Sequence, residues 1–298
     1  MKLNSLLISL VSTASLVTAG FYDNTKNIYE LNPSNFDDVV LKTNHTTVVE
    51  FYAPWCKYCI LMKGHYKRAA RVASDYATFG AVNCDKDENK PLCAKYHVEG
   101  FPTVMSFRPP KVNLDDYDEK KMKHSAEVYR GKREAKPLVE FLQGRIKNYV
   151  KRLNSLKLEK FLRVQDGQRD RVLLLTNKNS LSPVFKGLAI DYLGVYDFAY
   201  FPVNDDNRVL VSSKITVLDD DFDLPRIVLV TKDEIILFHG DVKSKSSISE
   251  FLSGYKQPVE GEFSVKGKAL KAINSGRAKN FRDFFKKQKK QQLVKDEL

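Results

Sequence analysis

The stretch VVEFYAPWCKYC, residues 48–59, joins a run of apolar, β-favouring residues to two cysteines that stand two residues apart. Residues 60–70, ILMKGHYKRAA, follow directly and predict a helix. This order places Cys56 at the start of a helix, where unpaired backbone N–H groups and the helix dipole favour a negative charge. A thiol there ionises more readily, and the thiolate is the form that attacks disulfides. The stretch therefore predicts a strand–CxxC–helix unit suited to thiol–disulfide exchange, with Cys56 and Cys59 as the reactive pair.

Such a cysteine pair also occurs in zinc sites and in inert structural disulfides. Structural zinc takes four ligands, but the other two cysteines, Cys84 and Cys93, are separated by eight residues and make a poor second half. None of the five histidines completes a ligand-spaced pair with them. A CxxC pair between a strand and a helix is typical of a thioredoxin-like redox site. We therefore expect redox chemistry without a metal or a cofactor.

The two ends of the chain predict its compartment. Lys2 precedes an apolar stretch over residues 3–17, and small residues follow, so residues 1–19 have the pattern of a secretory signal peptide. No later run of about 18 apolar residues occurs, so we expect no membrane span. The last four residues match the retention signal of the endoplasmic reticulum; they are Lys295, Asp296, Glu297 and Leu298. Together these segments predict a protein of the endoplasmic reticulum lumen.

That compartment is oxidising enough for disulfides to form and persist. Four cysteines allow three pairings, and proximity favours Cys56–Cys59 and Cys84–Cys93. The second pair would close a charged loop, residues 85–91, and loop entropy values such a closure at about 2.5–3 kcal/mol. We interpret Cys84 and Cys93 as a structural disulfide, with redox regulation as the alternative.

The segment Asn44-His45-Thr46 is an acceptor sequence for N-glycosylation. A chain that passes through the secretory pathway meets the enzymes that add this glycan. Asn44 is therefore a candidate glycosylation site.

Without residues 1–19 the chain has 279 residues, enough for two domains of ordinary size. The first predicted domain, residues 20–150, mixes strands and helices. Its predicted strands are 48–53, 79–83, 103–107 and 127–131, and its predicted helices are 57–75 and 135–147. Residues 108–126 are crowded with charge and too long for a hairpin turn, so we expect an exposed insertion there.

The second predicted domain, residues 151–260, repeats this order of elements without repeating the sequence. Its predicted strands are 171–176, 197–203, 226–230 and 234–238, and its predicted helices are 183–193 and 248–254. It contains no cysteine. We interpret it as a noncatalytic binding or spacing domain, with a purely architectural role as the alternative.

The last segment, residues 261–298, is strongly basic. It has 11 Lys and Arg and 4 Asp and Glu, a net charge of +7 out of +12 for the chain. A basic amphipathic helix there would suit anionic lipid or an acidic partner. Nucleic acid is the usual partner of a basic protein, but the lumen excludes it. We favour a solvated, partly helical spacer that carries the retention signal.

These motifs resemble a catalytic domain of the protein disulfide isomerase family. The resemblance rests on VEFYAPWC with Cys59 and on Gly100-Phe101-Pro102-Thr103, and residues 81–96 with Arg108-Pro109-Pro110 resemble its small fungal, Mpd-type members. It covers residues 21–149 and implies an α/β fold. The implied chain has a thioredoxin-like catalytic domain, a second cysteine-free thioredoxin-like domain and a basic C-terminal tail.

The resemblance implies a role for each residue of the motif. Cys56 would form a mixed disulfide with the client protein, and Cys59 would resolve it. Trp55 would offer a surface to unfolded chain beside the exposed thiol, or else pack in the ordinary way. Pro102 would follow a cis peptide bond, which leaves the backbone groups of Phe101 free to pair with a client segment as an added strand.

Two charged residues outside the CxxC pair also take roles from this resemblance. Glu50 is an acid within an apolar strand, and burial of an unpaired carboxylate raises its pKa. In the family this position accepts a proton near the resolving cysteine. Arg133 matches an arginine that approaches the resolving thiol. Some relatives place a lysine beside the buried acid, where this chain has Ala81.

The two residues between the cysteines are the largest departure from the family pattern. Efficient members have Gly-His there, whereas this chain has Lys57 and Tyr58. A histidine would stabilise the nearby thiolate, whereas Lys57 carries its charge on a flexible stem that salt screens. We expect a more reducing pair, hence a weaker oxidase that retains reduction or isomerisation.

The expected function is thiol–disulfide exchange on folding secretory proteins. The implied partners are unfolded or misoxidised secretory proteins, a thiol oxidant of the endoplasmic reticulum or glutathione, the retrieval receptor and, as a further candidate, another chaperone. One competing class is an escort that binds clients or a chaperone and in which the cysteine pair matters little. Another is a protein whose basic tail binds lipid or an acidic partner.

Overall fold

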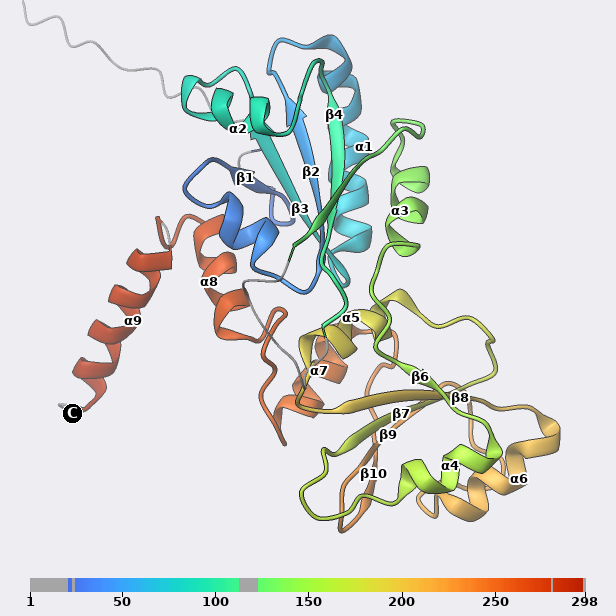
Figure 1. Cartoon of the computed structure of the whole chain (residues 1–298). Coiled ribbons are helices and arrows are strands. Elements are labelled where there is room, and N and C mark those ends of the chain that lie inside the picture. The colour runs from blue at the N-terminus through green and yellow to red at the C-terminus, as the bar shows by residue number, and fades with distance from the viewer. Residues whose placement is uncertain (1–20, 23–24, 113–122, 280, 297–298) are drawn as a thin grey trace, which may run out of the picture.

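The structure is a computed structural model that describes residues 21–22, 25–112, 123–279 and 281–296 (Figure 1). The predicted signal peptide, most of the charged insertion at 108–126, and Glu297 and Leu298 of the predicted retention signal lie outside these residues. The described part contains two five-stranded sheets, and each of them carries helices on both faces.

The first sheet is built around a strand that is buried along its whole length. This strand, β2 (Thr46–Tyr52), lies between β3 (Ala77–Asn83) and β4 (Thr103–Arg108). β1 (Tyr29–Leu31) and β5 (Ser125–Val128) form the edges, so that the strand order is β1-β3-β2-β4-β5. β1, β3 and β2 run parallel, whereas β4 and β5 are antiparallel to their neighbours.

Helices α1 (Lys57–Ala73) and α3 (Ala135–Gln143) pack together on one face of this sheet (Figure 1). Successive side chains of a strand point to opposite faces. Val48, Glu50 and Tyr52 therefore point toward α1, whereas Val49 and Phe51 join the core on the other face. The core on this other face of the first sheet is covered by a short π-helical turn (Asp37–Leu41) and by α2 (Lys90–Lys95). A short 3-10 turn (Asp87–Asn89) precedes α2.

The second sheet repeats the topology of the first. Its order is β10-β9-β7-β8-β6, in which β6, β8 and β7 are parallel and β9 and β10 are antiparallel additions. Its strands are β6 (Lys151–Arg152), β7 (Arg171–Thr176), β8 (Asp197–Pro202), β9 (Arg226–Val230) and β10 (Ile235–Leu237). α5 (Pro183–Asp191) and α7 (Lys245–Ser253) cover one face, and α4 (Ser155–Leu162) and α6 (Asp205–Lys214) cover the other.

The strongly apolar elements follow the sequence pattern closely. The strands predicted at 171–176 and 226–230 are confirmed with the same bounds. The pattern did not reveal the edge strands β1 and β6, because three and two residues are too few to show a period. It also missed α2, since the charged segment before it resembles an unstructured loop.

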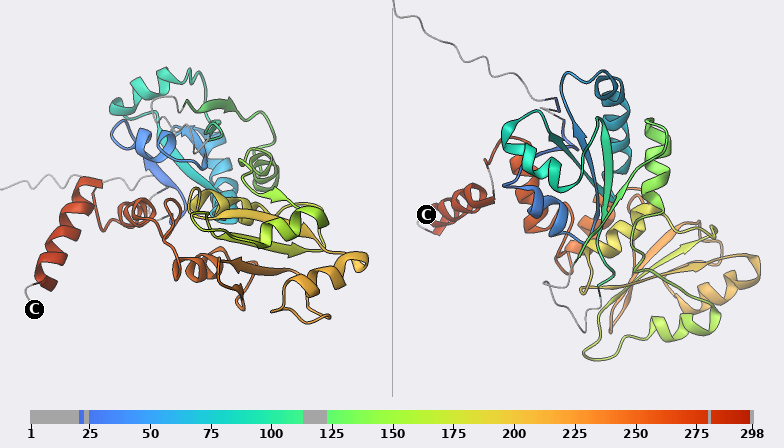
Figure 2. Two further views of the ribbon diagram at one scale, coloured as in Figure 1. Left: turned by 60° about the horizontal axis from the view of Figure 1, so that its bottom comes forward. Right: turned by 45° about the horizontal axis from the view of Figure 1, so that its top comes forward.

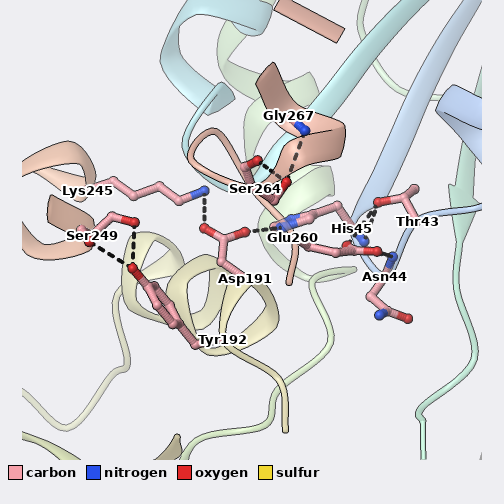
Figure 3. Close-up of polar contacts among 11 residues, drawn as sticks. Thr43, Asn44, His45, Asp191, Tyr192, Lys245, Ser249, Glu260, Ser264 and Gly267 are labelled. Atoms are coloured by element: carbon pink, nitrogen blue, oxygen red, sulfur yellow. Dashed lines mark hydrogen bonds and ion pairs between the residues drawn. The ribbon is translucent and has the colours of Figure 1, made fainter. Parts of the chain in front are cut away.

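A buried carboxylate joins the two sheets. Asp191 is the last residue of α5. Its carboxylate accepts a hydrogen bond from His45 at 2.6 Å and forms an ion pair with Lys245 Nζ at 2.8 Å (Figure 3). Nearby, the Glu260 carboxylate accepts the backbone N–H of Asn44 at 2.9 Å. The candidate glycosylation residue Asn44 is thus half-buried where the two sheets meet.

The basic C-terminal segment is packed over its first part, so the expected solvated spacer is wrong there. α8 (Val265–Asn274) begins at Ser264, whose hydroxyl caps the Gly267 N–H at 2.9 Å. Leu270 packs against the core of the first sheet, and Lys266 donates to the Lys42 carbonyl. α9 (Phe281–Asp296), which ends with Lys295 and Asp296, extends away from both sheets in the two views of Figure 2. Within the described ranges, no helix is long and apolar enough to cross a membrane.

We predict that Asp191→Ala lowers the free energy of unfolding by about 3–5 kcal/mol, because Lys245 and His45 would stay buried without their acceptor. Urea denaturation followed by circular dichroism measures the change. Asp197→Ala is the matched control, since the Asp197 ion pair with Arg169 is partly exposed and 3.3 Å long. We expect its cost to be at most about 1 kcal/mol. Equal effects of the two substitutions would contradict a stabilising role of the buried network.

Candidate active site

The two cysteines of the CxxC pair lie where β2 turns directly into α1. Cys56 is the N-cap of α1 with extended backbone angles, and its carbonyl accepts the Ile60 N–H at 3.0 Å. Cys59 lies one turn into the helix and is completely buried. Both are free thiols, and the Cys56 S–H donates to the Phe101 carbonyl at 3.5 Å. Cys56 at the helix start is itself buried, with 8% of its surface exposed, so the expected exposed thiol is not found; Cys59 is fully enclosed.

The environment drives the pKa values of the two thiols apart. Burial by itself would raise the pKa of Cys56, but hydrogen bonds from the Cys59 backbone and thiol and from the Tyr58 backbone, together with the charge of Arg133, lower it below its ordinary value. Burial raises the pKa of Cys59 to about 12, and the thiol hydrogen bond with Cys56 and the charge of Glu50 add to the rise. The lowered pKa favours the thiolate of Cys56, and the raised pKa keeps Cys59 protonated at neutral pH.

Glu50 lies behind the pair, fully buried on the α1 side of β2. Burial raises its pKa to about 8, although a hydrogen bond from Tyr22 and the charge of Arg133 lower it. The Tyr22 hydroxyl donates to Oε2 of Glu50. Among the described residues, no hydrogen-bond partner reaches Oε1. A buried carboxyl group with one unoccupied oxygen, near Cys59, is suited to exchange a proton with that thiol.

Tyr22 is a residue of this site that the sequence did not indicate. It lies 28 positions before Glu50, and no motif joins the two. The aromatic pair Phe21-Tyr22 close to the predicted cleavage point was the available signal.

Arg133 is exposed and contacts Tyr58 of the CxxC segment. Its guanidinium carbon is 5.4 Å from the centre of the Tyr58 ring, within the range of a cation–π interaction. Its charge lowers the pKa of both Cys56 and Glu50. The contact with Tyr58 thus holds Arg133 close enough to act on Cys56, and the sequence did not predict this contact.

Trp55 is two-thirds exposed next to Cys56 and is held in a fixed orientation. Its ring N–H donates to Asp85 at 2.9 Å, and its ring forms a T-shaped contact with the Phe101 ring, with 6.0 Å between the ring centroids. Asp85 follows Cys84, which forms a disulfide with Cys93. The disulfide ties the segment that holds Trp55 to α2.

A cis peptide bond precedes Pro102, beside the Cys56 thiol. The Phe101 carbonyl was expected to be free, but it accepts the Cys56 S–H. A thiolate has no proton to donate, so ionisation of Cys56 releases this carbonyl. The second sheet has a cis bond at the corresponding place, before Pro225 and the start of β9. No cysteine follows its central strand β7, in contrast to β2. In the described part of the chain, no three His, Cys, Asp or Glu side chains could hold a metal ion.

Comparisons with known proteins give the family. The thioredoxin family model matches residues 27–143. Protein disulfide-isomerase MPD1 of Saccharomyces cerevisiae is 33% identical over 91% of this chain and 92% of its own length. The chain belongs to the protein disulfide isomerase family. Homologues with this activity show that the protein is an enzyme of thiol–disulfide exchange.

Other relatives of this protein disulfide isomerase match over shorter stretches. A putative protein disulfide-isomerase of Dictyostelium discoideum is 33% identical over 59% of the chain and 40% of that relative. Protein disulfide-isomerase A6 of Mus musculus is 40% identical over 38% of the chain and 25% of that relative. Among solved structures, ERdj5 is similar with a TM-score of 0.45, at 19% identity over 76% of this chain and 30% of ERdj5.

We predict that iodoacetamide modifies Cys56 of the reduced isomerase at pH 7 and leaves Cys59 unmodified. The lowered pKa of Cys56 makes its thiolate available below the usual value of about 8.5, whereas Cys59 ionises only near its pKa of about 12. Mass spectrometry of peptides from samples quenched across a pH series measures both rates. Equal labelling of the two cysteines would show that the helix start does not separate them.

Proposed function

We propose that this isomerase forms, reduces and rearranges disulfides of folding secretory proteins through a mixed disulfide on Cys56. The observation that carries the proposal is the opposite shift of the two thiol pKa values at one helix start. A lowered pKa suits the attacking thiol, and a raised pKa keeps the second thiol protonated until it is needed.

In the first step the Cys56 thiolate attacks a sulfur of a client disulfide. One new S–S bond forms between Cys56 and the client, the client S–S bond breaks, and the leaving client sulfur takes a proton from solvent. For isomerisation, that client thiol, as its thiolate, attacks another client disulfide and releases a new client thiolate. This thiolate attacks the client sulfur of the mixed disulfide, so that a new client S–S bond forms, the bond to Cys56 breaks and Cys56 leaves as a thiolate. No electrons are gained or lost overall in this branch.

In the second branch Cys59 resolves the mixed disulfide. Its proton passes to the Glu50 carboxylate, its thiolate attacks Sγ of Cys56, and the client leaves as a thiolate. The client disulfide is thereby reduced and the Cys56–Cys59 disulfide is formed; the reverse sequence oxidises a client dithiol. Arg133 supports both steps, because its positive charge favours the ionised forms of Cys56 and Glu50.

Client chain would bind across the exposed Trp55 ring and the Phe101 backbone. Once Cys56 is ionised or bound to the client, the Phe101 carbonyl no longer accepts the thiol proton and can accept a backbone N–H of the client. Backbone pairing tolerates any sequence, as a general folding catalyst requires.

We assign the enzyme to the endoplasmic reticulum lumen on the pattern of residues 1–19 and of the last four residues. Residues 20–150 would form the catalytic domain, 151–260 the noncatalytic one, and 261–298 a basic tail. Cys84–Cys93 would be structural, and Asn44 a glycosylation site. The partners would be secretory clients, glutathione or a thiol oxidant, the retrieval receptor and another chaperone.

We further propose that Lys57 and Tyr58 make the pair more reducing than a Gly-His site. Lys57 is exposed, so solvent screens its charge. Tyr58 has no charge of its own, but its ring contacts the guanidinium of Arg133. The positive charge of Arg133 would partly replace that of the missing histidine.

An escort that binds clients without needing its thiols is the second candidate. The second sheet, which repeats the topology of the first without its cysteines, would then carry the binding. Replacing both Cys56 and Cys59 by serine in cells separates the two proposals, because an escort would keep its cellular role.

We predict that Cys56→Ser reduces the refolding of a scrambled disulfide protein to the uncatalysed rate, since no nucleophile remains at the helix start. Cys59→Ser should instead accumulate an enzyme–client adduct that a thiol reductant releases, because the mixed disulfide forms but cannot be resolved. Recovery of client activity and non-reducing gel electrophoresis measure the two results. Full activity of Cys56→Ser would overturn the proposal.

We predict that the double substitution Lys57→Gly, Tyr58→His makes the Cys56–Cys59 couple more oxidising by about 30 mV or more, a tenfold change in the equilibrium with glutathione. The reason is that histidine supplies a charge that stabilises the Cys56 thiolate and so the reduced form. Tyr58→Phe is the matched control, because it keeps the ring beneath Arg133. Equilibration in glutathione buffers measures both potentials, and an unchanged or more negative value for the double variant would refute the prediction.

A further inference from the structure

We infer that Tyr22 is a positioning residue for Glu50: its hydroxyl holds one oxygen of the carboxyl group and leaves the other to accept the proton of Cys59. The inference rests on the proposed function, in which Glu50 accepts that proton. It adds a residue from the N-terminal segment, outside the CxxC motif, to the machinery of the isomerase.

Tyr22 is fixed at both of its ends. Its side chain is 1% exposed, and its hydroxyl donates to Glu50 Oε2. Its backbone N–H donates to the Glu30 carboxylate at 2.9 Å, which also accepts the Tyr52 hydroxyl. The Tyr22 ring meets those of Tyr52 and Tyr66 at 5.7 Å each. The hydroxyl is therefore held at one point and cannot follow a moving carboxylate without breaking this packing.

The hydrogen bond divides the tasks of the two carboxyl oxygens. Oε2 is occupied by Tyr22, whereas Oε1 is buried and meets no hydrogen-bond partner in the described part of the chain. An unpaired buried polar atom is costly and therefore uncommon. Because Tyr22 occupies Oε2, Oε1 is the oxygen that remains to take the proton of Cys59, while the Tyr22 hydroxyl keeps its own.

Groups from every element around Glu50 act on its charge. Burial is the largest influence and raises the pKa to about 8; the Tyr22 hydrogen bond lowers it, Glu30 raises it, and Arg133 lowers it. The titratable and charged groups that face Glu50 are Tyr22 before β1, Glu30 in β1, Tyr52 in β2, Cys59 and Tyr66 in α1, and Arg133 before α3. Tyr22 is the group that donates a hydrogen bond to the carboxylate.

Tyr22 also stays protonated throughout the working pH range. Burial and the charge of Glu50 raise its pKa far above the ordinary tyrosine value. It therefore remains a donor when Glu50 is ionised, and it favours the ionised form over the protonated one. Loss of this donor raises the pKa of Glu50 above about 8, so that less carboxylate is present at neutral pH.

The proton transfer that Tyr22 supports is balanced. The Cys59 S–H gives its proton to Glu50 Oε1, and the Cys59 thiolate attacks Sγ of Cys56 in the mixed disulfide. The Cys56–Cys59 bond forms, and the bond between Cys56 and the client breaks. The client sulfur leaves with the electron pair and takes a proton from solvent, while the O–H bond of Tyr22 stays intact.

The test is the pH dependence of the rate at which the full-length enzyme resolves a preformed mixed disulfide between Cys56 and a peptide. We expect Tyr22→Phe to move the midpoint of this profile upward by about one pH unit, and to lower the rate about tenfold below the midpoint. Glu50→Gln should remove the titration and slow the step at every pH.

Tyr66→Phe is the matched control. The Tyr66 hydroxyl is as deeply buried and also lies near Glu50, but it donates to the carbonyls of Val48 and Gly80 and contacts the Glu50 backbone, not the Glu50 carboxylate. Its loss costs packing and hydrogen bonds without removing a donor to Glu50. A wild-type midpoint for Tyr66→Phe and a raised one for Tyr22→Phe would support the inference.

Two results overturn the inference in distinguishable ways. If Glu50→Gln slows the step but Tyr22→Phe keeps the wild-type midpoint, Tyr22 is structural only and the proposed proton acceptor stands. If Glu50→Gln itself behaves as the wild type, the proposed proton transfer and the inference both fail.

A measurement on the unsubstituted enzyme covers the case in which Tyr22→Phe does not fold. In the reduced protein, carbon-13 resonances of Glu50 Cδ and Tyr22 Cζ should move with one common midpoint while the tyrosine stays protonated. A Tyr22 resonance that does not respond to the Glu50 titration would show that the hydrogen bond is absent and would overturn the inference.

Discussion

The direct junction between β2 and α1 is the constraint on which the site depends. Because β2 is the central strand and is buried along its length, the helix that follows it begins at a fixed place. Cys56 caps that helix start and gains hydrogen bonds that lower its pKa, whereas burial is the largest influence on Cys59, one turn further, and raises its pKa. The difference between the pKa values of the two thiols thus follows from their positions at the helix start.

The same strand supplies the acid that serves the buried thiol. The period of two along β2 turns Val48, Glu50 and Tyr52 toward α1, which brings a carboxyl group into the core beneath Cys59. An isolated carboxylate there would be strongly disfavoured. Tyr22 supplies the compensating hydrogen bond, and the positive charge of Arg133 also favours the ionised form of Glu50. The site therefore draws on segments from before β1, from β2 and α1, and from before α3.

The second sheet repeats the topology without the chemistry. It has the same strand order and a cis bond before Pro225, but residues other than cysteine follow its central strand. The buried Asp191 joins it to the first sheet through His45, and Lys245 of α7 pairs with the same carboxylate from the side of the second sheet (Figure 3). Since His45 precedes β2 directly, the strand that ends at the active site begins at the junction of the two sheets.

The sequence by itself determined the CxxC unit, the α/β character and the repeated order of elements, because local hydrophobic period and helix-start chemistry are encoded by neighbouring residues. Glu50 was identifiable as an acid in an apolar run. Only the tertiary structure decided that Tyr22 holds Glu50, that Tyr58 seats Arg133 and that α8 packs on the first sheet. Each of these contacts joins residues separated by tens of positions or more, and no local pattern records which distant side chain a fold brings within reach.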